Sequence, residues 1–442
     1  MTKHRTSPYL IIILSFLIII IIGAILLSLP FAVKEGVNFS IIDALFTSTS
    51  AVCVTGLSPV KDFSADFTIF ANVTIILLVE IGGLGLVTIA IFAFSLLGLK
   101  IGVTDRFLIK ESLNQNSMKG MVKLVLFAVK ITLIIQAIGA IINFSIIIQH
   151  YSFWESLGMS VFHAISSFNN AGFDIFPGGA SSVLMREHPL LTINTIFLVI
   201  IGGIGFIVID DILSYHKRKK LSLHTKIVLK TTFMIILIGT VLLILFEKES
   251  WLNSLFTVVS ARTFGLQIVD LGSFKMLSIL LIMIIMFIGA SPSSTGGGIK
   301  TTTFYTALKS ITAFTVGRRP ITHKREISSQ SIIKAFVIII ISLLYVIITI
   351  FLISIIEIDN SSLADNQYEA FSKISFEVVS AYSTTGFTSG ILMLLSPFSK
   401  FLLIVSMFFG RVGLITIISV WNRHWHYEKA DIKYIEERLI IG

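Results

Sequence analysis

The segment SAVCVTGL (residues 50–57) recurs in altered form three more times along this 442-residue chain, as SFNNAGF (167–173), SARTFGL (260–266) and SAYSTTGF (380–387). We call these the first to fourth glycine segments, because each contains one glycine: Gly56, Gly172, Gly265 and Gly386. Aligned on that glycine, each copy has a small residue five positions upstream, namely Ala51, Ser167, Ser260 or Ala381. Four equivalent glycines would let one chain surround an ion with backbone oxygens, so the repeat predicts an ion pathway.

The composition indicates a membrane protein. Apolar residues make up 55% of the chain and charged residues 13%, whereas soluble proteins carry about a quarter charged residues. Residues 9–33 and 335–356 contain no charge, and about 20 apolar residues suffice to cross the hydrocarbon core. The run near the N-terminus is too long for a signal peptide, which predicts a retained first helix. We therefore expect a multi-pass protein of the plasma membrane, embedded in the lipid bilayer.

Basic residues gather in alternate loops and set the expected orientation. They concentrate at residues 100–123, 217–230 and 309–334 and at both ends of the chain. By the positive-inside rule, these segments and both termini are cytoplasmic. This distribution accounts for the net charge of +9 without a nucleic-acid partner. The single cysteine, Cys53, excludes an intramolecular disulfide, and the histidines lack the spacing of a zinc site.

The loops divide the chain into four parallel repeats, residues 1–110, 111–220, 221–325 and 326–425, followed by a cytoplasmic tail at 426–442. Each repeat is expected to contain a spanning helix, a short amphipathic helix, the glycine and a second spanning helix. The short helices are predicted at 41–52, 153–167, 251–261 and 368–382, and the second spanning helices at 67–99, 190–213, 276–314 and 398–421. A 15-residue helix covers roughly 20 Å and cannot span a bilayer, so it must enter and return. The predicted fold is all-α, with eight spanning helices around one central pore.

Carbonyl groups near the glycines are the expected ion ligands. Glycine reaches positive φ at little steric cost, which lets successive carbonyls point toward an axis. Short helices that end near the axis would also turn their negative ends toward a cation. A single such glycine would indicate only a turn, but four in register favour a potassium filter. The predicted ligands are Val54, Thr55, Gly56, Asn170, Ala171, Gly172, Thr263, Phe264, Gly265, Thr384, Thr385 and Gly386.

Each second spanning helix contains a glycine-centred break: IGGLG (81–85), IGGIG (201–205), IGASP (288–292) and FGRVG (409–413). Small residues at such places let membrane helices pack closely. In the third repeat, Pro292 and three glycines at 296–298 predict an unwound stretch. This stretch is not a phosphate loop, because Ile299 separates Gly298 from Lys300.

The repeated helix–pore–helix plan, GASPSSTGGGIKTTT (289–303) and FFGRVGLIT (408–416) resemble the Trk/Ktr/HKT superfamily of cation transporters, and most of all the membrane subunit of Ktr-type potassium transporters. The resemblance implies potassium uptake, a homodimer, and a cytosolic ring of RCK-type subunits that carry the nucleotide; no cofactor is expected in this chain. In the plant branch of the superfamily a serine at the first glycine favours sodium, so Gly56 implies potassium.

The resemblance also implies that residues 289–303 form an intramembrane gating loop below the filter. Its expected gate residues are Ser291, Pro292, Ser293, Ser294, Thr295, Gly296, Gly297, Gly298 and Lys300. Arg411 occupies the position of Gly83 and Gly203 in the earlier repeats, and an arginine at membrane depth needs partners. We expect it to hold the gate by donating to carbonyls of the loop and to the hydroxyls of Ser293, Ser294 and Thr295. Pairing with Glu80 is the alternative.

Other functions remain open at this stage. A sodium or weakly selective cation transporter, or sodium-stimulated uptake, fits the same plan, and Arg262 with Phe264 makes the third glycine segment bulkier than the others. A membrane-embedded enzyme would need convergent acid–base, nucleophilic or metal-binding groups. The sequence contains no such constellation, so we expect no enzyme.

Overall fold

The computed structural model describes residues 8–60, 62–97, 99, 101–112, 120–360, 362–363, 366–414 and 416–417. The predicted cytoplasmic tail and the basic residues at both chain ends lie outside this part. Four long helices dominate it: α1 (Pro8–Leu27), α7 (Met121–Ile147), α13 (Leu223–Glu247) and α17 (Ser329–Ile356). All four are long and apolar enough to cross a membrane, and large apolar side chains such as Ile21, Ile138 and Ile348 are exposed on them. The chain is thus a helical, multi-pass membrane protein.

Four shorter helices follow the long ones: α2 (Ile41–Val52), α8 (Phe153–Asn169), α14 (Trp251–Ala261) and α18 (Gln367–Ser383). Polar residues before each helix satisfy its first free N–H groups. The Ser40 and Ser250 hydroxyls accept from the N–H of Asp43 and Asn253 at 3.3 and 3.2 Å, and Asn366 does the same for Glu369 at 2.8 Å. In α8 the N–H of Ser152 donates to Glu155 at 3.3 Å. Local sequence therefore sets where these helices begin.

The second helix of each predicted repeat is interrupted, and each interruption lies at the glycine-centred break identified in the sequence. Helix α4 (Ile69–Leu84) is followed by α5 (Leu86–Leu96) at an angle of 92°. Helix α10 (Pro189–Ile204) gives way to α11 (Phe206–Leu213), and α19 (Pro397–Val412) ends at Gly413. Gly85, Gly205 and Gly413 mark these three breaks with φ of 82°, 94° and 86°, a conformation that ends a right-handed helix. Two bent pairs pass the length and composition test together in the described chain: α4 with α5, and residues 177–187 with α10, at an angle of 101°. Counting each pair as one span gives up to six spans.

In the third repeat the interruption is longer. Helix α15 (Met276–Phe287) ends well before α16 (Thr301–Thr315) begins, so residues 288–300 form a loop. Short helices complete the architecture: α3 (Phe63–Asp66), α6 (Val103–Ser112), η1 (Pro177–Gly179), α9 (Ser181–Glu187), α12 (Tyr215–Arg218) and η2 (Leu271–Ser273). The fold is helical as expected, apart from one short hairpin in which β1 (Ile321–Thr322) pairs antiparallel with β2 (Arg325–Glu326).

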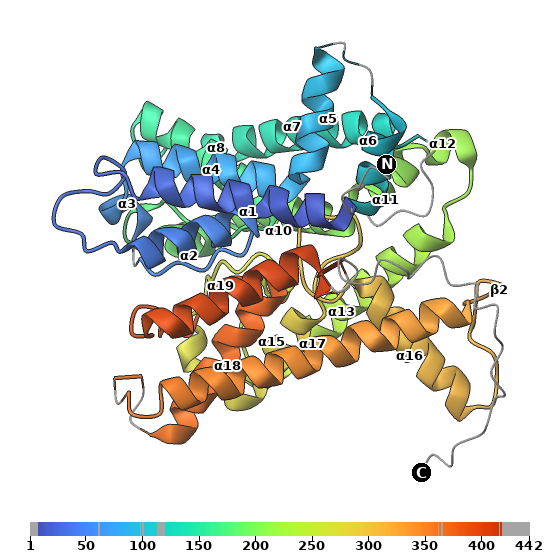
Figure 1. Cartoon of the computed structure of the whole chain (residues 1–442). Coiled ribbons are helices and arrows are strands. Elements are labelled where there is room, and N and C mark those ends of the chain that lie inside the picture. Colours follow the sequence, from blue (N-terminus) through green and yellow to red (C-terminus); the bar gives the residue numbers. More distant parts are fainter. Residues whose placement is uncertain are drawn as a thin grey trace, which may run out of the picture.

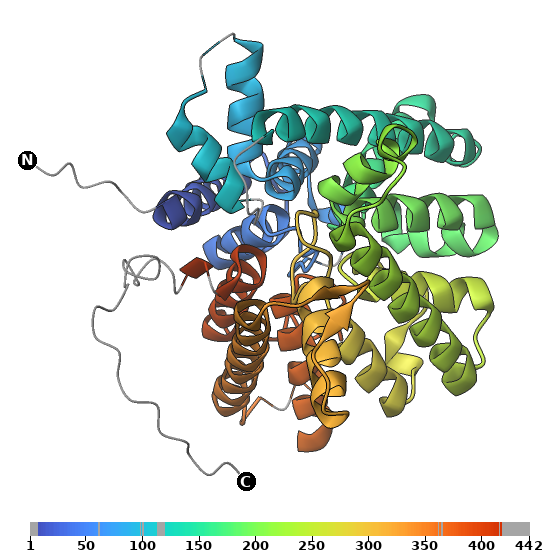
Figure 2. The same ribbon diagram turned by 90° about the vertical axis from the view of Figure 1, so that its right-hand side faces the viewer.

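The elements surround a common centre. In Figure 1 the long helices run across the view, with α5, α6, α12 and β2 gathered toward the right. Figure 2 looks from that side, and the colours pass around the centre from blue through green and yellow to orange and red. Helix α19 packs against α2, which joins the end of the described chain to its beginning. Lys400 and Asp43 form an ion pair of 2.8 Å there. Burial alone would raise the pKa of Asp43, but hydrogen bonds from Lys400 and Ser40 outweigh it and lower the pKa.

Candidate functional site

The four glycines adopt one backbone conformation. Gly56, Gly172, Gly265 and Gly386 have φ of 87°, 67°, 80° and 98°, the region that favours glycine. Two residues before three of them, Val54, Asn170 and Thr384 also have positive φ, at 57°, 60° and 51°. Positive φ in residues other than glycine is uncommon and marks a backbone held by its surroundings. The chain after α2, α8 and α18 therefore turns in the same way three times.

These glycines form a closed ring. A Cβ added to Gly56 would lie under 3.0 Å from the carbonyl oxygen of Ala171 in the second segment. The same overlap joins Gly172 to Phe264, Gly265 to Thr385, and Gly386 back to Thr55. Each glycine thus packs directly on the carbonyl that precedes the next glycine. Backbone carbonyls from all four segments meet around one axis, and no side chain other than hydrogen fits between them.

The structure corrects the alignment of the four glycine segments, because a serine near the start of each segment has the same hydrogen-bonding role in all four. The N–H groups of Thr55, Ala171 and Thr385 donate to the carbonyls of Ser50, Ser166 and Ser380 at 2.8, 2.8 and 2.9 Å. In the third segment Phe264 and Gly265 both donate to Ser260, at 2.8 and 3.1 Å. The equivalent residue is therefore the serine, and alignment on the glycine paired Ser260 with Ala51, Ser167 and Ala381 instead. The third segment has one residue fewer between serine and glycine, a difference visible in the sequence once the serines are aligned.

A buried carboxylate supports the fourth segment, and sequence reasoning missed it. Glu377, on α18, is 1% exposed. Its Oε1 accepts from the Thr388 hydroxyl at 2.6 Å and from the Ser389 N–H and hydroxyl at 2.7 and 3.0 Å. The Thr388 carbonyl in turn accepts from Gln267 at 2.9 Å. Glu377 thus fixes the chain just after Gly386 and, through Thr388, ties it to the third segment. The sequence did contain a signal for this role, because Glu377 is the one charged residue among residues 374–383 of α18.

We expect Glu377→Gln to disturb the ring without unfolding the protein. A glutamine keeps the shape, but its amide oxygen is a weaker acceptor than a carboxylate oxygen for the three hydrogen bonds from Thr388 and Ser389. The expected result is a roughly tenfold loss of discrimination between potassium and sodium in flux competition. Glu369→Gln is the matched control, because Glu369 lies in the first turn of the same helix and its carboxylate pairs with the partly exposed Lys373 at 2.8 Å. Equal selectivity in the two variants would contradict the supporting role of Glu377.

Two acidic residues accept hydrogen bonds that hold the chain after the first and second ring glycines. Asp62 accepts from the Gly178 N–H at 2.7 Å and caps α3. Asp174, two residues after Gly172, accepts from the Phe176 N–H at 2.9 Å and from the Ser181 hydroxyl. Burial raises the pKa of Asp174 to about 6, with Asp62 adding to the shift. Negative charge beside the second segment is thus reduced as the pH falls through about 6.

Glycines of the second helices pack against the short helices at one repeated place. A Cβ on Gly82, Gly202 or Gly410 would overlap the carbonyl of Val52, Phe168 or Tyr382, each four residues before a ring glycine. These three glycines are therefore equivalent. Arg411, which follows Gly410, occupies the place that Gly83 and Gly203 have in the first two repeats, as the sequence predicts.

The loop between α15 and α16 lies against two of the glycine segments. The Thr295 hydroxyl donates to the Phe168 carbonyl at 3.2 Å and accepts from Asn170 at 3.3 Å. The Gly297 N–H donates to the Thr384 hydroxyl at 3.0 Å. Side chains of the second and fourth segments thus hold the loop in place.

Other groups of the loop form hydrogen bonds within the loop or with residues of the second repeat. Ser291 donates its N–H to the Gly203 carbonyl at 3.0 Å, and Phe206 donates to Ser293 at the same distance. Lys300 donates to the Gly296 carbonyl at 2.7 Å, and Ser294 donates to Ser291 at 2.6 Å. The remaining predicted gate residues, Pro292 and Gly298, also make close contacts. A Cβ on Gly205 would overlap the Pro292 carbonyl oxygen. Gly298, with φ of 69°, lies against Gly289.

Arg411 joins the loop to the first repeat. Its Nη1 donates to the Thr295 carbonyl, and its Nη2 donates to the carbonyls of Gly82 and Gly83, the latter at 3.0 Å. The expectation of carbonyl acceptors on the loop therefore matches the structure. The expectation of hydroxyl acceptors is wrong for Ser294 and Thr295, whose hydroxyls donate to Ser291 and Phe168. Glu80 is not its partner either, because its Oε2 accepts from Gln136 at 2.8 Å and Asn169 at 2.6 Å.

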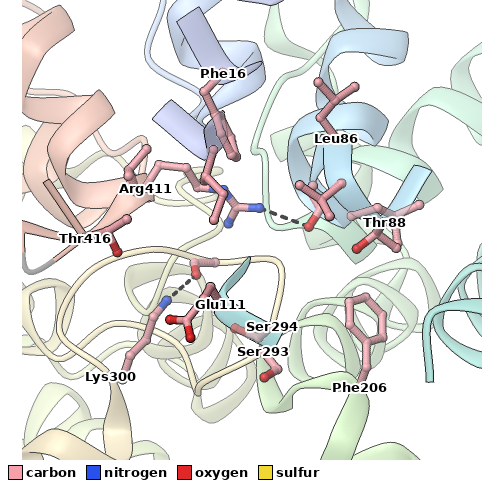
Figure 3. Close-up of a pocket in the computed structure, with 17 residues that line it drawn as sticks. Phe16, Leu86, Thr88, Glu111, Phe206, Ser293, Ser294, Lys300, Arg411 and Thr416 are labelled. Atoms are coloured by element: carbon pink, nitrogen blue, oxygen red, sulfur yellow. Dashed lines mark hydrogen bonds between the residues drawn. The ribbon is translucent and has the colours of Figure 1, made fainter. Parts of the chain in front are cut away.

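A cavity of about 100 Å³ borders these contacts. Gly83, Ser293, Ser294, Gly296, Lys300 and Arg411 are among the residues that line it. Figure 3 shows Arg411 and Lys300 reaching into it from different elements, each bonded to backbone oxygen. Two cationic side chains and part of the loop thus face this cavity.

The chain is similar to known cation transport proteins. Residues 2–424 match the family model described as TrkH, cation transport protein. The chain is 34% identical to the potassium/sodium uptake protein NtpJ of Enterococcus hirae, over all of this chain and 98% of that protein. It is 36% identical to the Ktr system potassium uptake protein B of Bacillus subtilis, over 99% of this chain and 97% of that protein.

The fold also matches a solved structure. The crystal structure of the potassium transporter TrkH from Vibrio parahaemolyticus superposes with a TM-score of 0.69 over 95% of this chain and 86% of that one. Sequence identity to it is 18%, so this likeness concerns the fold.

Proposed function

The chain belongs to the TrkH family of cation transport proteins, and from that premise we propose that it takes up potassium across the plasma membrane through the ring of glycine segments. The observation that carries the proposal is the closed ring, in which Gly56, Gly172, Gly265 and Gly386 each pack on the carbonyl that precedes the next glycine. The names of two relatives, which include potassium uptake, support the choice of ion.

Ion selection in this proposal depends on backbone oxygens. A potassium ion must replace its hydration shell, and carbonyls do so without a fixed charge that would trap it. The ligands would be the carbonyls of the four glycines and of the two residues before each, from Val54 and Thr55 to Thr384 and Thr385. The C-terminal ends of α2, α8, α14 and α18 precede these segments, so their negative ends favour a cation there.

Below the ring, residues 291–298 with Lys300 and Arg411 would form the gate. Support comes from the bonds of Thr295 and Gly297 to the second and fourth segments and of Arg411 to both the loop and Gly83. The broken second helices would cross the membrane together with α1, α7, α13 and α17, giving four repeats, eight spans and cytoplasmic termini. In this orientation α5, α6, α12 and the β1–β2 hairpin face the cytoplasm.

Regulation by a partner is part of the proposal. Ktr system relatives support a second, cytosolic subunit, and we propose a nucleotide-binding ring that contacts a homodimer of this chain at its cytoplasmic face. Basic residues there, including Lys217 and Lys309, suit either such a partner or lipid headgroups.

A second candidate function is transport of sodium or weak selection between the two ions. The short third segment favours it, because Thr263, two residues before Gly265, has φ of 158° where Val54, Asn170 and Thr384 have φ of 51–60°, so its carbonyl is oriented differently. The name of the Enterococcus relative, which includes sodium, is compatible with it.

Growth on limiting potassium tests the proposal. We expect the chain to restore growth of a host that lacks its own potassium uptake systems, and more strongly when the cytosolic subunit from the same genome is expressed with it. Uptake of labelled potassium in competition with sodium then separates the two candidates. Membrane insertion without any potassium-dependent growth or flux, with or without the partner, would contradict potassium uptake.

A further inference from the structure

Two histidines meet at one end of the second repeat, away from the ring. His150 follows the last turn of α7, and His188 lies between α9 and α10. Their Nε2 atoms are 3.0 Å apart, with ring centroids at 5.1 Å and ring planes at 67°. His150 is exposed and His188 is half-buried, so the pair can be reached from solvent. Neither residue has a part in the proposed ion pathway.

The backbone holds both histidines in place. The N–H of His150 donates to the Ile147 carbonyl at 3.0 Å, as part of the turn that ends α7. The N–H of His188 donates to Leu184 at 2.8 Å, and its carbonyl accepts from Leu191 at 3.0 Å at the start of α10. The separation of the two rings is therefore set by the ends of packed helices rather than by mobile chain.

We propose that His150 and His188 form a binding site for a divalent transition-metal ion with square or octahedral coordination, such as Cu²⁺ or Ni²⁺. Metal–imidazole bonds are about 2.0–2.1 Å long, so two nitrogens at right angles around one ion lie about 2.9 Å apart. The observed 3.0 Å matches this value. A tetrahedral ion would need roughly 3.4 Å, which makes Zn²⁺ the poorer fit.

The chemistry of the pair supports the assignment. Imidazole suits copper and nickel, and affinity for such sites rises along the divalent series to Cu²⁺. The two Nε2 atoms share a single hydrogen bond. An ion to one side of the line that joins them, with each imidazole turned toward it, would replace that hydrogen bond by two coordinate bonds. Within the described residues no group of three or more His, Cys, Asp or Glu side chains is placed to hold a metal. Water would therefore complete the coordination, and the site would be exchangeable rather than permanent.

A bound ion would connect the end of α7 to the start of α10. These are the first and second spanning helices of the second repeat in the proposed arrangement. In the orientation proposed above, this end faces the outside of the cell, where metal ions have direct access. Only that placement depends on the proposed function; metal binding itself does not.

Copper binding by the purified full-length chain tests the site. The protein is prepared in detergent with an affinity tag that contains no histidine, and Cu²⁺ is titrated as the free ion with calorimetry and electron paramagnetic resonance. We expect one tight equivalent per chain, a spectrum with two equatorial nitrogens, and at least tenfold weaker binding in His150→Ala and in His188→Ala. Ni²⁺ should compete for the site better than Zn²⁺.

His216→Ala is the matched control, because His216 is an exposed histidine on α12 at the other end of the second repeat. It should bind copper as the unmodified chain does. Undiminished binding in both His150→Ala and His188→Ala, or an equal loss in all three variants, would overturn the proposal. Because the titration needs no ion flux, its result is independent of whether the chain takes up potassium.

Discussion

Replacing Gly56 with serine is expected to lower the preference for potassium over sodium at least tenfold. The new Cβ would overlap the Ala171 carbonyl oxygen, and φ of 87° is a conformation that serine rarely adopts. The Ala171 carbonyl must move, and a ring whose selectivity depends on carbonyl positions then binds the two ions more equally. Competition of sodium against labelled potassium uptake measures the change directly.

Gly36 provides a closely matched control for this experiment. Its φ is also 87°, but a Cβ at Gly36 would meet nothing within 4 Å. Gly36→Ser therefore introduces the same backbone strain without the contact, and its selectivity should equal that of the unmodified chain. Serine at Gly172, Gly265 or Gly386 should resemble serine at Gly56, because each glycine packs on a neighbouring carbonyl. Unchanged ion ratios at all four ring positions would refute the filter assignment.

The sequence predicts the short helices and the ring glycines well because both depend on local chemistry. Helices α2 and α14 have the predicted bounds, and each starts at a capping serine. The breaks in the second helices were harder to place. Residues 67–99 are mostly apolar, so the sequence predicts one second spanning helix with a break somewhere in IGGLG, and the structure turns the chain by 92° at Gly85. Several glycines in IGGLG could have fulfilled that role.

Long-range pairs were the least predictable part of the site. Glu80 and Asn169 lie far apart in sequence, and the choice between an arginine partner and an amide partner for Glu80 depends on how α4 packs against α8. The pairing of Glu377 with Ser389 and that of His150 with His188 likewise depend on how separate elements pack, which the sequence does not show. In the third segment, alignment on the glycine concealed that Ser260 corresponds to Ser50, because a one-residue deletion leaves a similar polar pattern.

Arg411→Ala is expected to raise basal potassium flux several-fold. The alanine removes the donors to the Thr295 carbonyl and to Gly82 and Gly83, so the loop loses its connection to the first repeat. Bonds from a charged donor contribute about 1.5–3 kcal/mol each, enough to shift a closed loop roughly tenfold toward opening. Removal of the guanidinium also takes away a positive charge beside the path of the ion. Flux into liposomes, without the cytosolic partner, measures the basal rate.

Deletion of residues 291–298 should raise basal flux in the same way. The double variant should have little further effect, because both changes abolish the same closed state of the loop. Arg411→Lys should give an intermediate rate, since the one nitrogen of an ammonium group cannot reach both the Thr295 carbonyl and the Gly82 and Gly83 carbonyls, which bond to different nitrogens of the guanidinium. Arg319→Ala is the control, because Arg319 is exposed and pairs only with Glu326 in the described chain. A folded Arg411→Ala protein with the basal flux and partner response of the unmodified chain would contradict the gate. If that variant does not fold, a folded Arg411→Lys protein with unmodified flux would contradict it equally.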